Sequence, residues 1–149
     1  MGILAYEGSS LQCALWNPKT VRASADQQRV LVIHTEWAIG DSIALLLGLR
    51  GYSATLATDV FGARGSIAIT NPQAILLDTR VGATKNYSFA KELCLSEHAT
   101  KRLLIAMSNV SSLESVDLLK KAGYDGHSQR PCPMWQIADL LDSFFAHET

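Results

Sequence analysis

Short apolar runs that alternate with segments of helical period constrain the fold more than any other feature of the sequence. Residues 30–33, 74–77 and 103–107 are continuous apolar runs, which are typical of strands covered on both faces in a parallel sheet. Shorter segments at 53–57 and 127–129 predict two further strands. The alternation predicts an α/β fold with a doubly wound, five-stranded parallel sheet and five helices.

The helical segments are identified by their apolar period and by the residues that end them. Ile39, Ile43, Leu46 and Leu47 fall on one helical face, and Gly51 follows where a C-cap glycine is favoured. Two other helices are expected at residues 60–69, ended by Asn71-Pro72, and at residues 88–95, with Phe89 and Leu93 on one face. A further helix is opened by a Ser111/Glu114 capping box, runs through the apolar positions Leu113, Val116 and Leu119, and is stopped by Gly123. The last helix begins at Pro133 and has Ile137, Leu140, Leu141 and Phe144 on one face.

Length and pattern indicate how the chain is divided. Its 149 residues suit one domain of ordinary size. Residues 1–28 carry scattered apolar groups and then a polar run, so we expect an N-terminal extension or linker there. The α/β domain is expected to span residues 29–147.

Charge, cysteine content and hydropathy exclude several classes of function. The chain has 13 basic and 14 acidic residues and no basic stretch, so neither a nucleic-acid partner nor a membrane surface is indicated. Cys13, Cys94 and Cys132 form no CxxC pair, which argues against a zinc site or a disulfide framework. Without a leader segment or an apolar run of about 18 residues, we expect a cytoplasmic protein.

Polar residues that follow the predicted strands mark the candidate site. In doubly wound sheets, ligands bind outside the carboxyl ends of the strands. Those ends present His34, Thr35 and Glu36 after the first strand, Asp78 after the third, Ser108 after the fourth and Arg130 after the fifth.

Three strings of residues in register carry a resemblance to a known family. They are Ile75-Leu76-Leu77-Asp78, Ala106-Met107-Ser108 and Lys121-Ala122-Gly123-Tyr124-Asp125-Gly126. Together they resemble the receiver domain of two-component response regulators, over residues 30–145. The resemblance implies a flavodoxin-like receiver fold, with Asp78 at the phospho-acceptor position, Ser108 at the switch hydroxyl and His127 at the aromatic switch position.

The sequence departs from this family where the family's chemistry takes place. His34 and Thr35 stand where a typical receiver has the acidic pair that binds magnesium, and Glu36 occupies the position after the pair. Magnesium prefers carboxylate and water oxygens, so we expect weak or absent Mg²⁺ binding and no other cofactor. Arg130 replaces the family's lysine, and Gly82 replaces its proline after the acceptor.

These departures predict a pocket that needs neither metal nor phosphate. We expect Asp78 to pair with Arg130, with Arg80 as a second candidate cation, and to hydrogen-bond His34. In that state Ser108 has no phosphoryl group to sense, and Asp78 is a carboxylate that caps its loop.

The leading functional hypothesis is an atypical, pseudo-receiver-like signalling module that is not an enzyme. It would bind a histidine kinase or another signalling protein, or form a homodimer, through the face of the fourth helix, fifth strand and fifth helix. That face comprises residues 112–122 and 134–145, with His127 between them. The alternative is a phospho-accepting response-regulator receiver in a two-component phosphorelay.

Two further features leave alternatives open. Arg80, Lys85 and Arg130 could bind a small anion in the same crevice. Trp37 and Trp135 each begin a helix, where tryptophan could mark a partner surface or cover the edge of the core.

Overall fold

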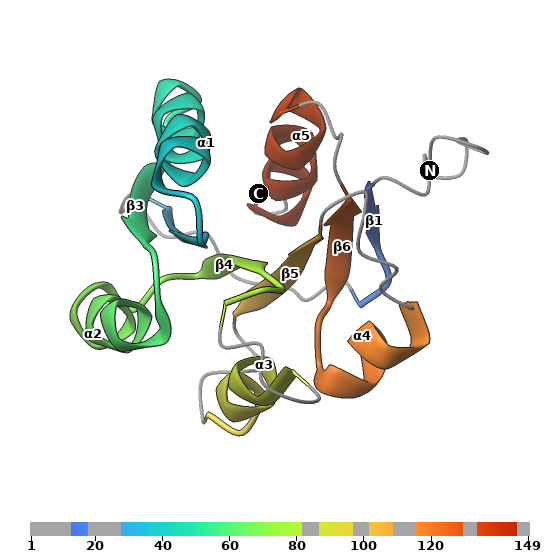
Figure 1. Ribbon diagram of the computed structural model, residues 1–149. Coiled ribbons are helices and arrows are strands. Elements are labelled where there is room, and N and C mark those ends of the chain that lie inside the picture. The colour runs from blue at the N-terminus through green and yellow to red at the C-terminus, as the bar shows by residue number, and fades with distance from the viewer. Residues whose placement is uncertain are drawn as a thin grey trace.

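The apolar runs of the sequence form the interior of one sheet in the computed structural model, which describes residues 13–17, 28–81, 87–96, 102–108, 116–129 and 134–145. The strands lie in the order β1-β6-β5-β4-β2-β3, seen from right to left in Figure 1. The five strands from β2 to β6 are parallel, as predicted. The strands are β1 (Cys13–Leu15), β2 (Arg29–Ile33), β3 (Ser53–Ala57), β4 (Ala74–Asp78), β5 (Leu103–Ser108) and β6 (Gly126–Gln129).

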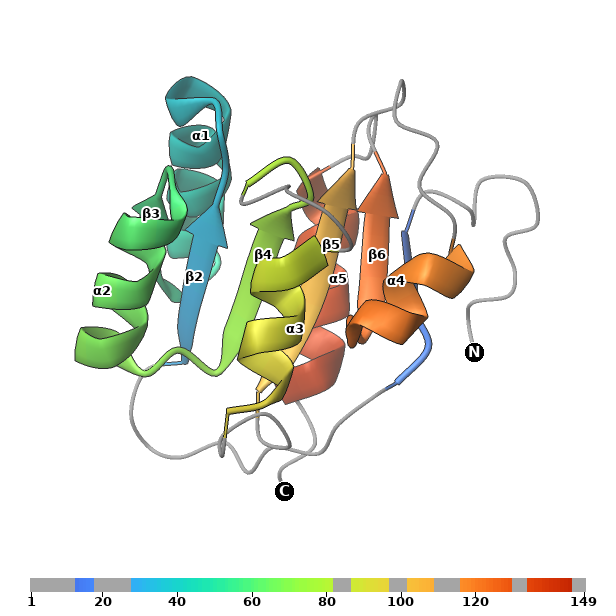
Figure 2. The same ribbon diagram turned by 60° about the horizontal axis from the view of Figure 1, so that its bottom comes forward.

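Helices cover both faces of the sheet. They are α1 (Trp37–Leu49), α2 (Val60–Thr70), α3 (Ser88–Cys94), α4 (Val116–Ala122) and α5 (Met134–Phe145). The helices α1 and α5 lie on one face, and α2, α3 and α4 lie on the other (Figures 1 and 2). This is the doubly wound arrangement that the alternating pattern predicts. None of the helices in the described ranges is long and apolar enough to cross a bilayer.

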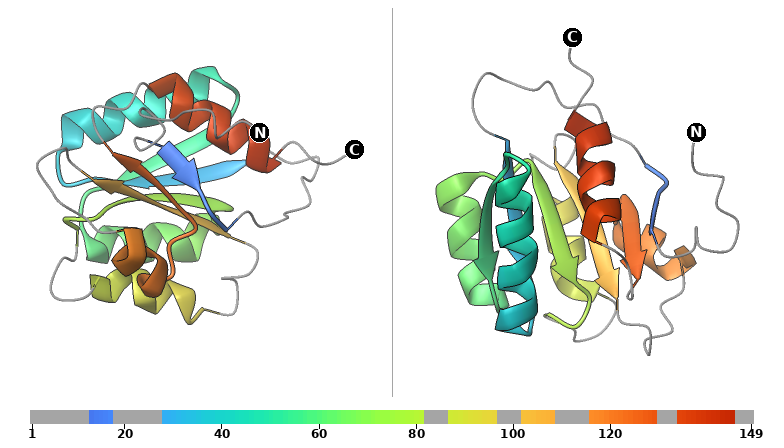
Figure 3. Two further views of the ribbon diagram at one scale, coloured as in Figure 1. Left: turned by 90° about the vertical axis from the view of Figure 1, so that its right-hand side faces the viewer. Right: turned by 90° about the horizontal axis from the view of Figure 1, so that it is seen from above.

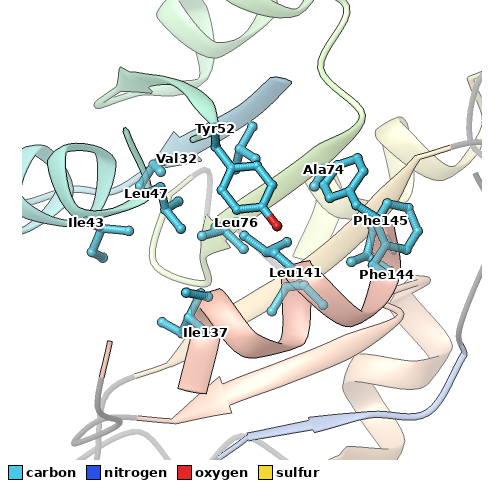
Figure 4. Packing of buried hydrophobic residues seen from close by; sticks show 14 of the residues in the cluster. Val32, Ile43, Leu47, Tyr52, Ala74, Leu76, Ile137, Leu141, Phe144 and Phe145 are labelled. Carbon is cyan, nitrogen blue, oxygen red and sulfur yellow. The ribbon is translucent and has the colours of Figure 1, made fainter. Parts of the chain in front are cut away.

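A core lies on each face because successive residues of a strand point to opposite sides. In β4, Leu76 packs with Leu47 and Leu141 under α1 and α5 (Figure 4). Its neighbours Ile75 and Leu77 pack on the opposite face, under α2, α3 and α4. Burying each such side chain stabilises the fold by about 1.5–3 kcal/mol, so both faces hold the sheet in place.

The predicted helix ends agree with the structure. Gly51 and Gly123 follow α1 and α4 with φ of +97° and +105°, backbone conformations that glycine adopts without a steric penalty. Asn71 ends α2 in the left-handed conformation, immediately before Pro72. The proposed Ser111/Glu114 capping box lies outside the described residues.

Four residues predicted on buried helical faces are not fully buried: Ile39 and Leu140 are partly buried, and Leu46 and Val116 are exposed. Leu46 and Val116 retain 40% and 41% of their accessible surface. Each sits at the margin of its apolar stripe, because a step of three residues along a helix turns the side chain by about 300° rather than a full circle. The inward positions Ile43, Leu47 and Leu119 are buried as predicted.

The N-terminal extension contributes a strand that the sequence pattern did not indicate. Strand β1 pairs antiparallel with β6, with Ala14 opposite His127. Figure 3 (left) shows β1 at the sheet edge between α5 and α4. At least these three residues of the predicted extension or linker are therefore part of the sheet.

Two residues after β1 secure this strand to the domain. Trp16 donates from Nε1 to the Tyr124 carbonyl at 2.8 Å, and its ring lies 5.5 Å from the Lys120 ammonium. Asn17 donates from its side chain to Asp125 Oδ1 at 2.7 Å. The other oxygen of Asp125 accepts the Leu104 backbone N–H, so one buried carboxylate joins the N-terminal segment to β5.

Candidate functional site

The candidate site forms where β2 and β4 end side by side. Ile33 pairs with Leu77 in the parallel ladder, so the residues that follow each strand emerge next to one another. Asp78 ends β4 and is only 2% exposed. The sheet thus places His34, Thr35 and Asp78 together, as predicted from the sequence.

Arg80 is the main partner of Asp78. Its guanidinium donates from Nε to Oδ1 at 3.1 Å and from Nη2 to Oδ2 at 2.9 Å, a two-bond contact between a planar donor and a carboxylate. The Arg80 backbone N–H also donates to Oδ1 at 3.0 Å. The side chain returns to the aspartate two residues before it because the chain turns immediately after β4.

Thr35 supplies two more hydrogen bonds to Asp78. Its backbone N–H and its hydroxyl donate to Oδ2 at 3.1 and 3.0 Å. A carboxylate offers about four lone-pair sites, and the donors from Thr35 and Arg80 fill them. Asp78 is therefore a fully hydrogen-bonded carboxylate inside the fold.

His34 lies beside this carboxylate but is oriented by the backbone. Its Nδ1 accepts the Glu36 N–H at 3.0 Å and lies 3.5 Å from Asp78 Oδ2. A nitrogen that accepts a hydrogen bond carries no proton, so Nδ1 is not a donor to Asp78 in this arrangement. The positive charge next to the aspartate comes from Arg80.

Glu36 joins the site from the start of α1. It is the N-cap residue of that helix, since β2 ends at Ile33 and does not continue. Its Oε2 lies 3.7 Å from Arg80 Nη1. Arg80 consequently sits between two carboxylates, a buried one on Asp78 and a more exposed one on Glu36.

Opposing effects act on the ionisation of Asp78. Burial alone would raise the pKa of Asp78, but hydrogen bonds from the Arg80 guanidinium and from the Arg80 and Thr35 backbones lower it below its ordinary value. The same contact with Asp78 raises the pKa of Arg80. Asp78 and Arg80 are both ionised at neutral pH.

Ser108 and His127 form a separate buried pair on β5 and β6. Ser108 Oγ lies 2.9 Å from His127 Nε2, and both residues are at most 5% exposed. The two positions assigned by resemblance to a switch hydroxyl and a switch aromatic are thus joined directly by a hydrogen bond.

Several sequence-predicted residues fall outside the described ranges. Arg130, the expected partner of Asp78, is one of them, as are Gly82 and Lys85. The expected pair of Asp78 with Arg130 therefore stays a prediction. Arg80, expected only as a second candidate cation, makes the contact with Asp78. The sequence feature that could have predicted this contact is an arginine two residues after an aspartate that ends a strand, because a turn at that point brings the two side chains together.

The described side chains around Asp78 differ from an oxygen cage for a divalent cation. Thr35 and Arg80 are donors, His34 Nδ1 is occupied by a backbone N–H, and the Glu36 carboxylate faces Arg80. Within the described ranges, no cluster of three or more histidine, cysteine, aspartate or glutamate side chains is arranged to hold a metal ion.

Comparisons with known proteins identify the fold. No family model and no curated protein matches the sequence. Among solved structures, the chain is similar to the chemotaxis response regulator CheY4 of Vibrio cholerae, with a TM-score of 0.71 and 17% identity over 80% of this chain and 100% of that one. It is also similar to the Francisella response regulator 1452 receiver domain, with a TM-score of 0.68 and 23% identity over 79% of this chain and 96% of that one.

A third similar structure is HP1043, an orphan response regulator of H. pylori. Its TM-score is 0.66, with 18% identity over 83% of this chain and 98% of that chain. At these identities the likeness establishes the fold and not the chemistry. The chain has the receiver fold, which confirms the fold class predicted from the sequence.

Proposed function

We propose that this chain is an atypical receiver-like signalling module that acts through protein–protein contacts without phosphorylation of Asp78. The observation that carries the proposal is the two-bond contact of the Arg80 guanidinium with the Asp78 carboxylate. A receiver fold is compatible with a response-regulator type of signalling role. The contact with Arg80 supplies a fixed positive charge where phosphoryl transfer would need a metal.

The engaged carboxylate argues against phosphoryl transfer. To attack a phosphoryl group, Asp78 would have to give up hydrogen bonds to Arg80 or Thr35, and it is only 2% exposed. Magnesium does not fit this donor set, because a guanidinium nitrogen lies 2.9 Å from one carboxylate oxygen and would repel a divalent cation. We therefore propose that Mg²⁺ binding is weak or absent.

The proposed partner is a histidine kinase or another signalling protein, or a second copy of the chain, in the cytoplasm. The proposed docking face is that of α4, β6 and α5, as the resemblance implies. We include strand β1 in this proposed face, because β1 pairs with the outer edge of β6. The proposal assigns no enzymatic activity to the chain.

Calorimetry with beryllofluoride and Mg²⁺ tests whether the site accepts a phosphoryl group. We expect no binding heat and no change in tryptophan fluorescence, because Arg80 occupies the Asp78 carboxylate and its positive charge keeps Mg²⁺ from binding there. Incubation with acetyl phosphate and Mg²⁺ should likewise leave the mass of the chain unchanged.

Two matched variants separate the role of Arg80 from a general effect of charge. Arg80→Met should make metal binding detectable, because it frees the carboxylate. Arg64→Met removes a different arginine, which is paired with Glu92 on the surface. In this control variant, metal binding should stay as weak as in the unmodified chain. Labelling of Asp78 in the unmodified chain at the rate of ordinary receivers would overturn the proposal and favour the phosphorelay alternative.

A further inference from the structure

The two edges of the sheet are finished differently. Strand β1 covers β6 at one edge, whereas no strand among the described residues pairs with the outer side of β3. Figure 1 shows β3 at this edge with α1 above it and α2 below it. Exposed sheet edges usually carry charge or proline that blocks pairing, yet β3 has the sequence Ser-Ala-Thr-Leu-Ala.

The backbone of β3 presents hydrogen-bonding groups along this edge. Ser53 donates its N–H to Gln28, and Ala57 accepts the His34 N–H, so these residues face β2. In a parallel ladder, alternate residues direct their backbone groups to opposite sides. The N–H and C=O groups of Ala54 and Leu56 therefore point outward, where an extended segment could pair with them.

Two open surface hollows lie beside this edge. One hollow of about 340 Å³ lies between α1 and β3 and is lined by Leu45, Leu49 and Ala54. A second hollow of about 500 Å³ lies at the carboxyl end of β3, between Trp37 and Phe61. Asp41 lines both, so we describe them together as the edge groove.

Large apolar side chains along the edge groove are exposed. Leu49 is 76% exposed and Phe61 is 88% exposed, while Trp37, a candidate partner-surface residue in the sequence, is 64% exposed. Trp37 therefore does not cover the core, and aromatic side chains of this kind are enriched among residues that anchor protein partners.

The charge of the edge groove selects the partner. Its charged lining residues are Asp41 and Asp59. The basic side chains that follow α1, lie on α2 and follow β4 are already paired: Arg50 with Asp139 and Asp142, Arg64 with Glu92, and Arg80 with Asp78 and Glu36. Two carboxylates beside two exposed aromatic rings favour a lysine or arginine side chain. A second copy of this chain would instead pair its own β3 with this edge, and that strand has no charged residue to meet the two carboxylates.

We propose that the edge groove binds an extended segment of a partner protein that adds a strand to β3, with alternate apolar side chains against α1 and a basic residue between Asp41 and Asp59. This is strand addition, in which backbone pairing provides affinity and side-chain pockets provide specificity. The surface lies away from the α4, β6 and α5 face, and it does not involve the chemistry of Asp78.

Defined peptides test the proposal on the full chain. We use two peptides of about nine residues in which valine alternates with threonine. One peptide carries lysines at its amino end and the other at its carboxyl end, so that lysine can reach Asp41 and Asp59 whether the added strand runs parallel or antiparallel to β3. We expect one of them to shift the amide resonances of Ala54 and Leu56. Counterparts with glutamate in place of lysine should bind about fivefold more weakly or worse.

A double variant locates the contribution of charge. Asp41→Asn with Asp59→Asn should abolish the preference for lysine over glutamate. Asp59 caps α2 by accepting the Gly62 N–H at 2.7 Å, and asparagine keeps this capping ability. Asp117→Asn, in the first turn of α4, is the control and should preserve the preference.

Three outcomes would overturn the proposal. The first is that neither peptide shifts the β3 resonances. The second is that lysine and glutamate peptides bind equally. The third is a shift of the same resonances with protein concentration alone, which would identify a second copy as the occupant.

Discussion

At the scale of single residues, Asp78 and Arg80 set the character of the candidate site. The guanidinium provides the fixed cation, and Thr35 completes the hydrogen bonding of the carboxylate. Because these bonds lower the pKa of Asp78, the ionised side chain is more favourable in the folded than in the unfolded chain. Its contribution to stability must therefore depend on pH.

Asp78→Asn should reveal that dependence. Asp78 has a lower pKa in the folded chain, so its stabilising effect is complete above its unfolded pKa of about 3.9 and is lost as pH falls through the folded value. At pH about 7, we expect the unmodified chain to exceed the variant by about 1–3 kcal/mol in free energy of unfolding. Urea titrations should show this difference shrinking below pH about 4.

Glu92→Gln is the control for this measurement. Glu92 pairs with Arg64 at the surface, where both side chains are about half exposed, so its removal should cost less than about 1 kcal/mol at any pH. A difference between the unmodified chain and Asp78→Asn that stays constant from pH about 7 to 3 would contradict the proposed ion pair.

At the scale of elements, strand β1 is held by few but specific contacts. It has three residues, and a strand this short needs support from neighbouring residues. Trp16 provides an indole hydrogen bond to Tyr124 and a contact with Lys120, and its backbone N–H donates to Asp125. Trp16 therefore anchors the N-terminal segment to α4 and to the residues immediately before β6.

Trp16→Ala should release β1 while leaving the parallel sheet intact. We expect a loss of about 1–3 kcal/mol, from one hydrogen bond and the apolar contact of the ring. Hydrogen exchange should accelerate at the amides of β6 that face β1 and not in β4. Trp135→Ala is the control, because it removes a ring that is 62% exposed on α5, and it should leave amide hydrogen exchange in β6 unchanged. If the β6 amides exchanged at the same rate in both variants, Trp16 would have no anchoring role.

At the scale of the whole molecule, one sheet shared by two cores makes the fold cooperative. Strand β4 contributes Leu76 to one core and Ile75 to the other, and both side chains are fully buried. Damage on either face therefore disturbs the strand that supports the opposite face.

Leu76→Ala and Ile75→Ala should each destabilise the entire fold. A cavity at either position costs about 2–5 kcal/mol, and circular dichroism and tryptophan fluorescence should report a single coincident unfolding transition. Ile69→Gln, at a residue that is 84% exposed, should change stability by about 0.5 kcal/mol or less. Two separate transitions would contradict the cooperative arrangement.

The sequence by itself determined the elements and their class. Continuous apolar runs identify strands buried on both faces. The strand predicted at 53–57 has the observed bounds, and the run at 74–77 lies within β4, which ends one residue later at Asp78. Local rules also located the helix ends at Gly51, Asn71 and Gly123. These features depend on short-range preferences of the chain, so a single sequence is enough to predict them.

Only the tertiary structure decided which groups meet. Strand β1 gave no periodic signal because three residues are too few, and its place depends on contacts of Trp16 and Asn17 with residues more than 100 positions away. The approach of Thr35 and Arg80 to Asp78 depends on the register of β2 with β4 and on the turn after β4. Such contacts are fixed by packing in three dimensions, which the local pattern of residues does not encode.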